Sequence, residues 1–360
     1  MSLDLGAGLV ALLRQIVDIE SVSGNEAELA DAVETTLRRY PHLMVERDGD
    51  CVVARTHLGR AERVVIAGHL DTVPVAENLP SSVEDHPKGL RVVGRGTCDM
   101  KGGVTVMLTL AAELSDPNRD ITWIFYDNEE VDATRNGLRR LAANRPELLE
   151  ADFAVLMEPT SAEIEGGCQG TCRIVIATQG KAAHSARAWM GINAIHGLGE
   201  VLRRLEDYRP AQVEVDGLVY REGLNAVRIH GGVAGNVIPP TASVEVNYRF
   251  APDKSPDDAL AELARVFDGY EFEVVDMSPG ARPGLDLPLA QQFVAAVGGE
   301  ARPKYGWTDV SRFSALGVPA VNYGPADPLV AHADDEFCPA ADLERCASGL
   351  RAWLTSTSEG

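Results

Sequence analysis

The chain has 360 residues, 45% of them hydrophobic, which is enough to bury the core of one large domain or of two modest ones. Its formal net charge is −21, from 33 basic and 54 acidic side chains. Because nucleic acids and anionic membranes bind proteins through positive charge, this balance argues against both as partners. A small anionic substrate would need a local basic patch.

The cysteines and the N-terminal segment predict a cytoplasmic protein. The six cysteines are scattered and form no C-x-x-C motif, which weighs against a thiolate zinc site or a thioredoxin-like centre. The N-terminal segment contains acids early and lacks the basic start of a signal peptide. No run reaches the ~18 apolar residues of a membrane span. Free thiols in a reducing cytoplasm are the simplest interpretation.

The N-terminal part of the chain predicts two helices followed by a hairpin. Within residues 5–18, apolar side chains recur at helical spacing and form one face. Ser23 and Glu26 have the S-x-x-E spacing of a capping box, which would open a second helix that ends near Tyr40. Asp48-Gly49 stands between two strand-like runs, which is a typical signal of a tight turn.

Three short apolar runs predict buried strands, and each ends just before residues that can bind a metal. The runs are 64–68, 121–126 and 153–157. The residues that follow them are His69 and Asp71, Glu129 and Glu130, and Glu158. Strands that alternate with helices predict an α/β fold with a mostly parallel sheet flanked by helices. Ligands of such sheets bind outside the carboxyl ends of the strands, so these side chains are expected to converge.

A glycine-rich turn, GRGTCDMKGG at 94–103, contains Asp99. The apolar segment 104–114 that follows lacks proline and is too long for a strand, so it predicts a buried helix. An isolated Asp at a helix N-terminus is most simply a cap, where the helix dipole favours its charge. Beside the acids and the histidine above, and with His332 in a late loop, Asp99 becomes a candidate metal ligand.

Beyond Cys172 the pattern changes to strands and helices without a cluster of metal-type residues. The predicted strands are 173–180, 213–220, 225–233 and 243–251, and the predicted helices are 189–208 and 256–270. Residues 172–282 therefore predict a smaller, inserted α+β domain. A further strand-like run within 313–324 precedes His332, so residues 1–171 and 283–360 are expected to form one discontinuous domain.

The order of these motifs resembles the di-zinc aminoacylase and carboxypeptidase superfamily. Its members contain H-x-D, a G-x-x-D-x-K-G-G turn, a Glu-Glu pair, an E-P and a late His in this order, and here the five span Gly68 to His332. The resemblance implies a zinc-peptidase-like catalytic domain. In residues 172–282 it implies a lid through which two subunits form a homodimer. It also implies a cis peptide bond between Asp99 and Met100.

The resemblance further implies two zinc ions per subunit, with cobalt able to substitute. Asp99 would bridge the two ions, with His69 and Glu158 on one ion and Glu130 and His332 on the other. Carboxylates and imidazoles are suitable zinc ligands, and a bridging carboxylate fits a two-metal hydrolase.

Three further residues receive catalytic roles. By resemblance, Glu129 is the general base that deprotonates the water and passes the proton to the leaving amine, and His184 stabilises the oxyanion. Asp71 lies two residues from His69 and can accept its imidazole N–H, which would fix the ring tautomer. Without the resemblance, Glu129 could be a solvated acid, and an isolated histidine such as His184 is more often structural or exposed.

Substrate-binding residues are expected in the second domain and in the late loop GWTDVSRF. Asn236 and Arg249 match the superfamily's carboxylate-binding residues, although Arg249 fits a surface ion pair equally well. The late residues assigned to substrate binding are Thr308, Ser311, Arg312 and Gly324. The late loop looks like the one that contacts substrate in succinyl-diaminopimelate desuccinylases, with Asp309 displaced relative to Arg-Phe.

The late loop and the sequence AHADDEF make the chain most similar to the succinyl-diaminopimelate desuccinylases within this superfamily. The similarity implies removal of succinate from N-succinyl-LL-2,6-diaminopimelate, a small anionic N-acyl amino acid, in the synthesis of lysine and peptidoglycan precursors. Three alternatives stay open: an N-acetylornithine deacetylase, a carboxypeptidase that releases an acidic residue, and a non-catalytic metal-binding scaffold. A Glu129 base argues against the scaffold, which has no use for it.

Overall fold

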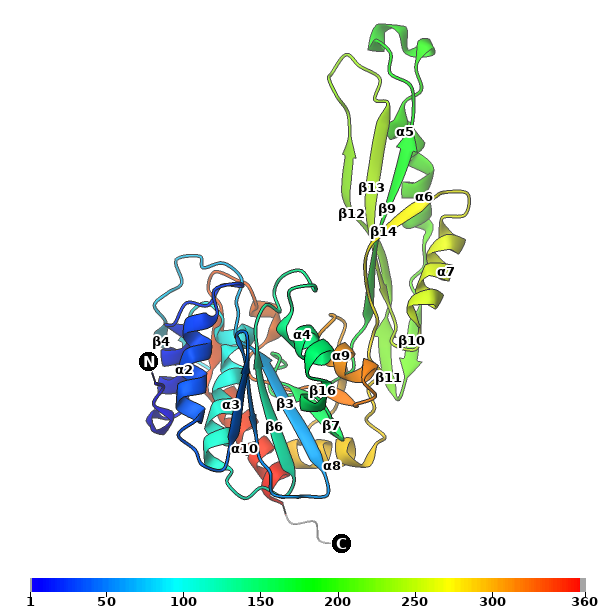
Figure 1. Cartoon of the computed structure of the whole chain (residues 1–360). Helices are drawn as coiled ribbons and strands as arrows, with labels where there is room; N and C mark the ends of the chain where they lie inside the picture. Colours follow the sequence, from blue (N-terminus) through cyan, green and yellow to red (C-terminus); the bar gives the residue numbers. More distant parts are fainter. Residues whose placement is uncertain (1, 357–360) are drawn as a thin grey trace. The chain divides into compact units, whose positions relative to one another are not determined.

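The computed structural model describes residues 2–356, which fold into two compact units (Figure 1). The first unit is built from the chain up to Gly166, from Pro283–Arg302 and from the chain after Ser311. The second unit consists of Gly167–Arg282 and Pro303–Ser311. The segment Pro303–Ser311 thus groups with the inserted unit, whereas the sequence assigned it to the discontinuous domain. The roles of catalytic domain and lid stay predictions.

A mostly parallel sheet forms the centre of the first unit, as the sequence predicts. Its strand order is β1-β2-β6-β3-β7-β16-β8-β15, and the middle strands β6, β3, β7 and β16 run parallel. The strands are β1 (Met44–Asp48), β2 (Cys51–Arg55), β3 (Arg63–His69), β6 (Asp120–Tyr126), β7 (Phe153–Leu156), β8 (Glu165–Gly166), β15 (Arg302–Pro303) and β16 (Ala320–Asn322). All of β6 is buried, because helices cover both faces of the sheet. Figure 1 shows α2 and α3 on one side of these strands and α4 on the other.

The helices of the first unit pack apolar faces against this sheet and against one another. They are α1 (Leu9–Val17), α2 (Ala27–Leu37), α3 (Gly102–Glu113), α4 (Gly137–Asn144), α8 (Pro288–Val297) and α10 (Ala340–Thr355), while α9 (Val310–Ala315) begins at the unit boundary. The segment predicted as a buried helix is α3, which is buried nearly all round because it contacts α1, α2, α10 and the sheet. A small sheet adjoins α10 and contains β4 (Ser82–His86), β5 (Gly89–Val93) and β17 (Phe337–Pro339).

The predicted hairpin is confirmed. Strands β1 and β2 pair antiparallel, with Asp48 opposite Cys51. Gly49 has a φ of 57°, which glycine adopts without strain and which suits a tight two-residue turn. The three predicted buried strands are confirmed as well, as β3, β6 and β7.

The predicted capping box is wrong. The side chain of Glu26 makes no cap hydrogen bond to α2 and instead accepts the Gly24 N–H at 2.9 Å. Ser23 Oγ donates to the carboxylate of Asp71, from a different loop, at 2.7 Å. A serine hydroxyl can bond to a local or to a distant partner, and Ser23 bonds to the distant acceptor instead of capping α2.

An antiparallel sheet with the order β12-β13-β9-β14 forms the second unit. Its strands are β9 (Gly170–Gln179), β12 (Gly223–Gly231), β13 (Thr241–Phe250) and β14 (Phe272–Ser278), and a separate hairpin contains β10 (Gln212–Val215) and β11 (Leu218–Arg221). The helices α5 (Ala194–Gly197), α6 (Gly199–Asp207) and α7 (Pro256–Val266) share one apolar core with the four-stranded sheet.

Three details of the second unit differ from the sequence prediction. The run 213–220 is two strands, because Asp216-Gly217 adopt positive φ and turn the chain. The helix predicted over 189–208 is interrupted before Asn193, whose side chain caps the new helix α5. Strand β14 was not predicted, since all seven of its residues are only partly buried or exposed and its apolar pattern is weak.

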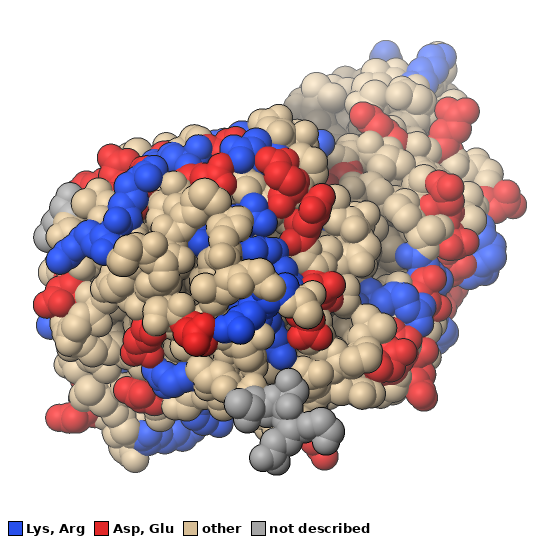
Figure 2. All heavy atoms as spheres, turned by 60° about the horizontal axis from the view of Figure 1, so that its bottom comes forward, with Lys and Arg blue, Asp and Glu red and all other residues tan. Residues whose placement is uncertain are grey.

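The surface charge is mixed rather than of one sign. On the face drawn in Figure 2, Lys and Arg side chains are interleaved with Asp and Glu, although the net charge is −21. Some arginines pair with more than one acid, as Arg140 does with Asp48 and Asp127. Over residues 2–356, no helix combines the length and the apolarity that crossing a membrane requires.

Gly103→Ala should destabilise the first unit. A Cβ at Gly103 in α3 would clash with the Met157 carbonyl oxygen and lie 2.7 Å from the Met157 Cβ. Relieving such a clash requires a backbone shift, which typically costs ~1–3 kcal/mol. Gly199 in α6 is the matched control, because nothing lies within 4 Å of an added Cβ there. Chemical denaturation should show lower stability for Gly103→Ala and unchanged or higher stability for Gly199→Ala, whereas equal effects would contradict this packing.

Candidate metal centre

The predicted site residues of the first unit lie at the carboxyl ends of neighbouring parallel strands. β3 ends at His69, and β6 and β7 end just before Glu129 and Glu158. These strands are hydrogen-bonded neighbours, so their ends lie side by side. Asp99 belongs to the turn before α3. Its peptide bond to Met100 is cis, which confirms that prediction.

Asp99 lies between two histidines. One carboxylate oxygen is 3.1 Å from His69 Nε2, and the other is 3.4 Å from His332 Nε2. His332 Nε2 is also 2.9 Å from Glu130 Oε1. Asp99 therefore belongs to two groups of three potential ligands, one with His69 and Glu158 and one with Glu130 and His332, and the donor atoms within each group lie within 4.8 Å of one another. A bridging carboxylate requires this arrangement.

The electrostatic field of the cluster favours positive charge. Burial alone would raise the pKa of Asp99, but hydrogen bonds from His332 and His69 outweigh burial and lower that pKa. Hydrogen bonds to Asp99 and Glu130 raise the pKa of His332 to about 10. Burial opposes charge on His69, yet Asp71 and Asp99 raise its pKa well above the ordinary value. A field that holds protons on two imidazoles also attracts a cation, which displaces those protons when it binds.

The donor atoms fit zinc. Each group contains one imidazole nitrogen and two carboxylates, which are ordinary zinc ligands. The nearest cysteine in sequence, Cys98, is buried, and its Sγ lies 3.3 Å from the Asp327 carbonyl oxygen. Burial raises the pKa of the Cys98 thiol, which disfavours the thiolate that a zinc ligand requires.

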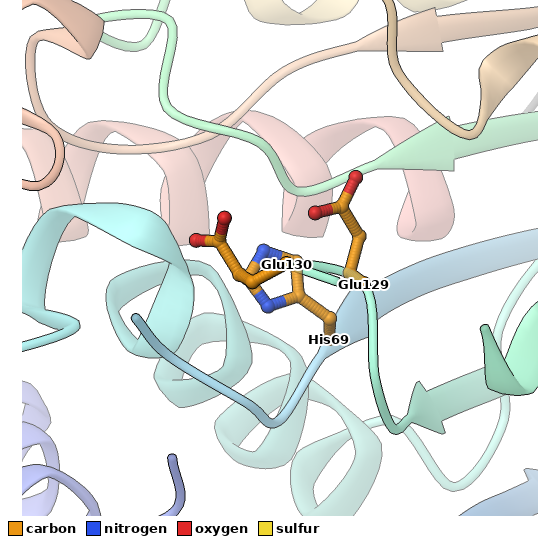
Figure 3. A group of neighbouring side chains, drawn as sticks. All are labelled: His69, Glu129 and Glu130. Atoms are coloured by element: carbon orange, nitrogen blue, oxygen red, sulfur yellow. The ribbon is translucent and has the colours of Figure 1, made fainter. Parts of the chain in front are cut away.

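Glu129 and Glu130 follow one another in a loop that Asp71 holds. The Asp71 carboxylate accepts the Glu129 N–H at 2.9 Å and the Glu130 N–H at 3.0 Å. Asn128 has a φ of 56°, a backbone conformation that is uncommon outside glycine and that clusters at functional sites. Figure 3 shows the two glutamate carboxylates pointing in different directions around the His69 ring. The two neighbours can therefore serve different functions.

Asp71 orients His69 through its backbone more than through its side chain. His69 Nδ1 is 3.0 Å from the Asp71 carbonyl oxygen but 3.5 Å from its carboxylate, which is at the limit of a hydrogen bond. With Nδ1 donating to that carbonyl, Nε2 faces Asp99 and is available as a ligand atom. The Asp71 carboxylate mainly holds the Glu129–Glu130 loop.

Two residues that support this loop, Glu26 and Ser23, were not predicted to do so from the sequence. Glu26 is fully buried and accepts the Asn128 N–H at 3.1 Å, next to the proposed base. Ser23 donates to the Asp71 carboxylate, which in turn holds the amides of Glu129 and Glu130. The only signal in the sequence was their S-x-x-E spacing, and it indicated a local cap.

In the second unit, His184 and Asn236 lie together and Arg249 lies apart. His184 forms an isolated β-bridge with Val237. The N–H of Ser185, the residue after it, donates to the Asn236 carbonyl oxygen at 2.9 Å. Both side chains are exposed. Arg249, near the end of β13, pairs with Thr171 at the beginning of β9. Gln179, at the other end of β9, pairs with Thr241 at the beginning of β13 and leads to His184. His184 and Arg249 are therefore at opposite ends of this strand pair.

The late residues are divided between the units. Thr308 and Ser311 are buried in the second unit, where Ser311 Oγ donates to the Pro279 carbonyl oxygen at 2.7 Å. Arg312 and Gly324 belong to the first unit. A Cβ at Gly324 would clash with the backbone that leads into Glu158, so the close approach there requires glycine. Substrate contact by these residues stays a proposal.

The chain is similar to known proteins over nearly its whole length. The sequence model of peptidase family M20/M25/M40 matches residues 65–356. A Mycobacterium tuberculosis protein, provisionally named a succinyl-diaminopimelate desuccinylase, is 52% identical over 98% of this chain and 99% of the relative. A succinyl-diaminopimelate desuccinylase of Corynebacterium glutamicum is 45% identical, with 98% of each chain covered. A dinuclear metal-binding peptidase of Bacillus subtilis shares the fold, with a TM-score of 0.70 at 16% identity and 96% of each chain covered.

Zinc should bind to the chain with a stoichiometry of two, since Asp99 is shared by two ligand groups. His332→Ala removes an imidazole from one group only and should lower the stoichiometry to about one at the same free zinc concentration. His86, an exposed histidine of β4, is the matched control, and His86→Ala should still bind two ions. Equilibrium dialysis followed by elemental analysis measures these numbers. A single ion on the unsubstituted chain at saturation would contradict a shared Asp99.

Proposed function

The chain belongs to peptidase family M20/M25/M40, and we propose that it is the amide hydrolase that removes succinate from N-succinyl-LL-2,6-diaminopimelate. The family confirms the predicted superfamily resemblance. Water cleaves the amide bond, and the products are succinate and LL-diaminopimelate, a precursor of lysine and peptidoglycan. Identities of 52% and 45% to relatives that bear this enzyme's name, over nearly their whole length, favour this substrate.

One observation supports hydrolysis most directly. Asp99 is shared by two ligand groups, and the loop of Glu130 places a second acid, Glu129, beside them. A binding scaffold needs the ligands but has no need of an additional carboxylate beside them.

We assign two zinc ions to each subunit, with cobalt able to replace them. The proposed ligands are His69, Asp99, Glu130, Glu158 and His332. When bound, the two ions would lower the pKa of a water molecule to near neutral and would stabilise negative charge on the substrate oxygen. The donor set given above fits this role.

In the proposed mechanism, Glu129 takes a proton from the attacking water and later delivers it to the leaving amine. The Asp71 carboxylate holds the Glu129 N–H and so fixes where the base lies. Hydrogen bonds from the protein limit the movement of a catalytic group, which keeps it in reach of the reacting atoms. The Asp71 carbonyl oxygen orients the His69 ring in the same site.

The second unit is proposed to be a lid that forms a homodimer. In β12, the exposed side chains of Val227 and Ile229 are apolar, and this strand is at the edge of its sheet. An exposed edge strand is a natural surface for pairing with a second copy. The exposed His184 would then donate a hydrogen bond to the oxyanion, which strengthens as charge develops in the transition state.

The remaining proposed residues would bind the two ends of an anionic substrate. Arg249 offers a planar fork that matches a carboxylate, and Asn236 lies beside His184. The other proposed contacts are Thr308, Ser311, Arg312 and Gly324. The reaction is proposed to take place in the cytoplasm, where the six free, buried cysteines would stay reduced.

A substrate panel tests the acyl group. The zinc-loaded protein should hydrolyse N-succinyl-LL-2,6-diaminopimelate with a higher kcat/KM than N-acetylornithine or acidic dipeptides. Buried groups that pair with the distal carboxylate of succinate are left unpaired by an acetyl group, which typically costs a large factor in kcat/KM. A preference for N-acetylornithine would assign the chain to deacetylation instead. Loss of all activity on every substrate with zinc bound would favour the scaffold.

Glu129→Gln should retain the fold and both metal ions but lose most activity. The amide keeps the shape of the side chain and removes the base, and general acid–base catalysis typically contributes ~10²–10⁴-fold in rate. Glu150→Gln is a matched control with no expected effect, because Glu150 is exposed and precedes the amino end of β7, opposite to the end that leads to Glu158. Zinc stoichiometry and kcat are measured together. Unchanged kcat would mean that Glu129 is structural.

Mixing two inactive variants tests whether His184 acts across the dimer. Glu129→Gln and His184→Ala should each be nearly inactive, since an oxyanion donor is typically worth ~10²–10³-fold in kcat. A heterodimer of the two would contain one site with both residues intact, so mixtures that exchange subunits should regain activity. Mixtures that form heterodimers without regaining activity would contradict this arrangement, as would an active monomer.

A further inference from the structure

A buried glutamate holds the turn that contains Asp99. Glu336 lies four residues after His332 in the same loop, and it is 1% exposed. One of its carboxylate oxygens accepts the Cys98 N–H at 2.9 Å and the Asp99 N–H at 3.1 Å. These amides belong to Asp99, a proposed metal ligand, and to Cys98, the residue before it. The carboxylate therefore restricts the direction in which the Asp99 side chain leaves the backbone.

The second carboxylate oxygen of Glu336 is occupied by an arginine. Arg95 donates to it from a distance of 2.9 Å, and both side chains are buried. Arg95 also donates to the carbonyl oxygens of Ala333 at 3.2 Å and Pro74 at 3.0 Å. The buried charges are thus paired and hydrogen-bonded, which is the condition under which they persist inside a protein.

Backbone pairing fixes Glu336 in register with the Asp99 turn. The Gly94 N–H donates to the Glu336 carbonyl oxygen at 3.0 Å. Next to it, Phe337 at the start of β17 pairs with Val93 at the end of β5. The segment that leads to Asp99 and the segment that follows His332 are therefore joined at one point. Asp99 and His332 belong to the same ligand group.

We propose that Glu336 is a positioning residue of the metal centre, which sets the geometry of Asp99 relative to His332. The proposal rests on the metal centre assigned above. Every group that faces the Glu336 carboxylate in these contacts is a donor. Only a carboxylate offers acceptors on both oxygens, because the amide of Gln would turn an N–H₂ donor toward the backbone amides or toward Arg95.

Glu336→Gln should weaken zinc binding without removing a ligand. Residues that orient metal ligands through hydrogen bonds typically contribute ~10–100-fold to metal affinity. We expect the weaker of the two zinc dissociation constants to rise by about that factor, measured by competition with a chromophoric chelator. The visible absorption spectrum of the Co²⁺-loaded protein should also change, because it reports the geometry of the ligands. Excess zinc should restore part of kcat.

Asp120→Asn is the matched control. Asp120 is also a buried carboxylate of the first unit that accepts two backbone N–H groups, from Leu58 at 2.8 Å and Arg60 at 3.1 Å. It begins β6, so it lies about 20 Å along the strand from the end that leads to Glu129. This control should lower the melting temperature and leave both zinc dissociation constants and the Co²⁺ spectrum unchanged.

Glu336→Asp is the second variant, since its shorter side chain keeps the charge but cannot reach all three donors. Its zinc affinity should fall between those of the unsubstituted chain and Glu336→Gln. Unchanged zinc affinity and an unchanged Co²⁺ spectrum in Glu336→Gln would overturn the proposal. Failure of both Glu336 variants to fold would overturn it too, because Glu336 would then be required for folding and not specifically for the geometry of the metal centre. If the unsubstituted chain binds no zinc, the assignment of the metal centre is wrong, and the Glu336 proposal is wrong with it.

Discussion

The structure of the first unit depends on how its buried negative charge is compensated. Asp99 lies with Glu158 and His69 in one group of candidate ligands and with Glu130 and His332 in another, so each group pairs two carboxylates with one imidazole. Carboxylates that are brought together out of water repel one another and are costly unless positive charge or hydrogen bonds compensate them. The histidines His69 and His332 on either side of Asp99 supply that compensation within the chain. Two divalent ions would compensate these carboxylates more strongly, so the same cluster is suited to hold metal ions.

The strand order of the central sheet explains why these residues meet. In a parallel sheet all carboxyl ends lie at one edge, so loops from strands that are distant in sequence become neighbours there. β6, β3 and β7 are adjacent, and they lead in that order to Glu129, His69 and Glu158. The loops are irregular, with positive φ at Asn128 and His332, so the ligands depend on hydrogen bonds from outside the loop to hold their positions.

The sequence predicted that the candidate ligands converge, but it did not predict the residues that support them. β3, β6 and β7 are short apolar runs, and a polar residue directly after such a run can be placed at the sheet edge without knowledge of the rest of the fold. Glu26 and Glu336 could not be found in this way. Their partners are backbone N–H groups, which every residue except proline offers, so the pairing leaves no pattern of residue types. For Glu26 the local spacing even indicated the wrong partner, because S-x-x-E fits a cap as well as a distant contact.

Backbone donors also decide which acids are available to a metal. Asp71, Glu26 and Glu336 are all close to the cluster in sequence or in space, yet each accepts two or more N–H groups. A carboxylate whose oxygens are occupied by donors must lose those hydrogen bonds before it can bind an ion, and the donors left behind would be buried without partners. Asp99 and Glu130 instead face imidazole nitrogens, which can turn from donor to metal ligand when their protons leave. The distribution of backbone amides therefore separates the acids that can bind metal from the acids that hold the site together.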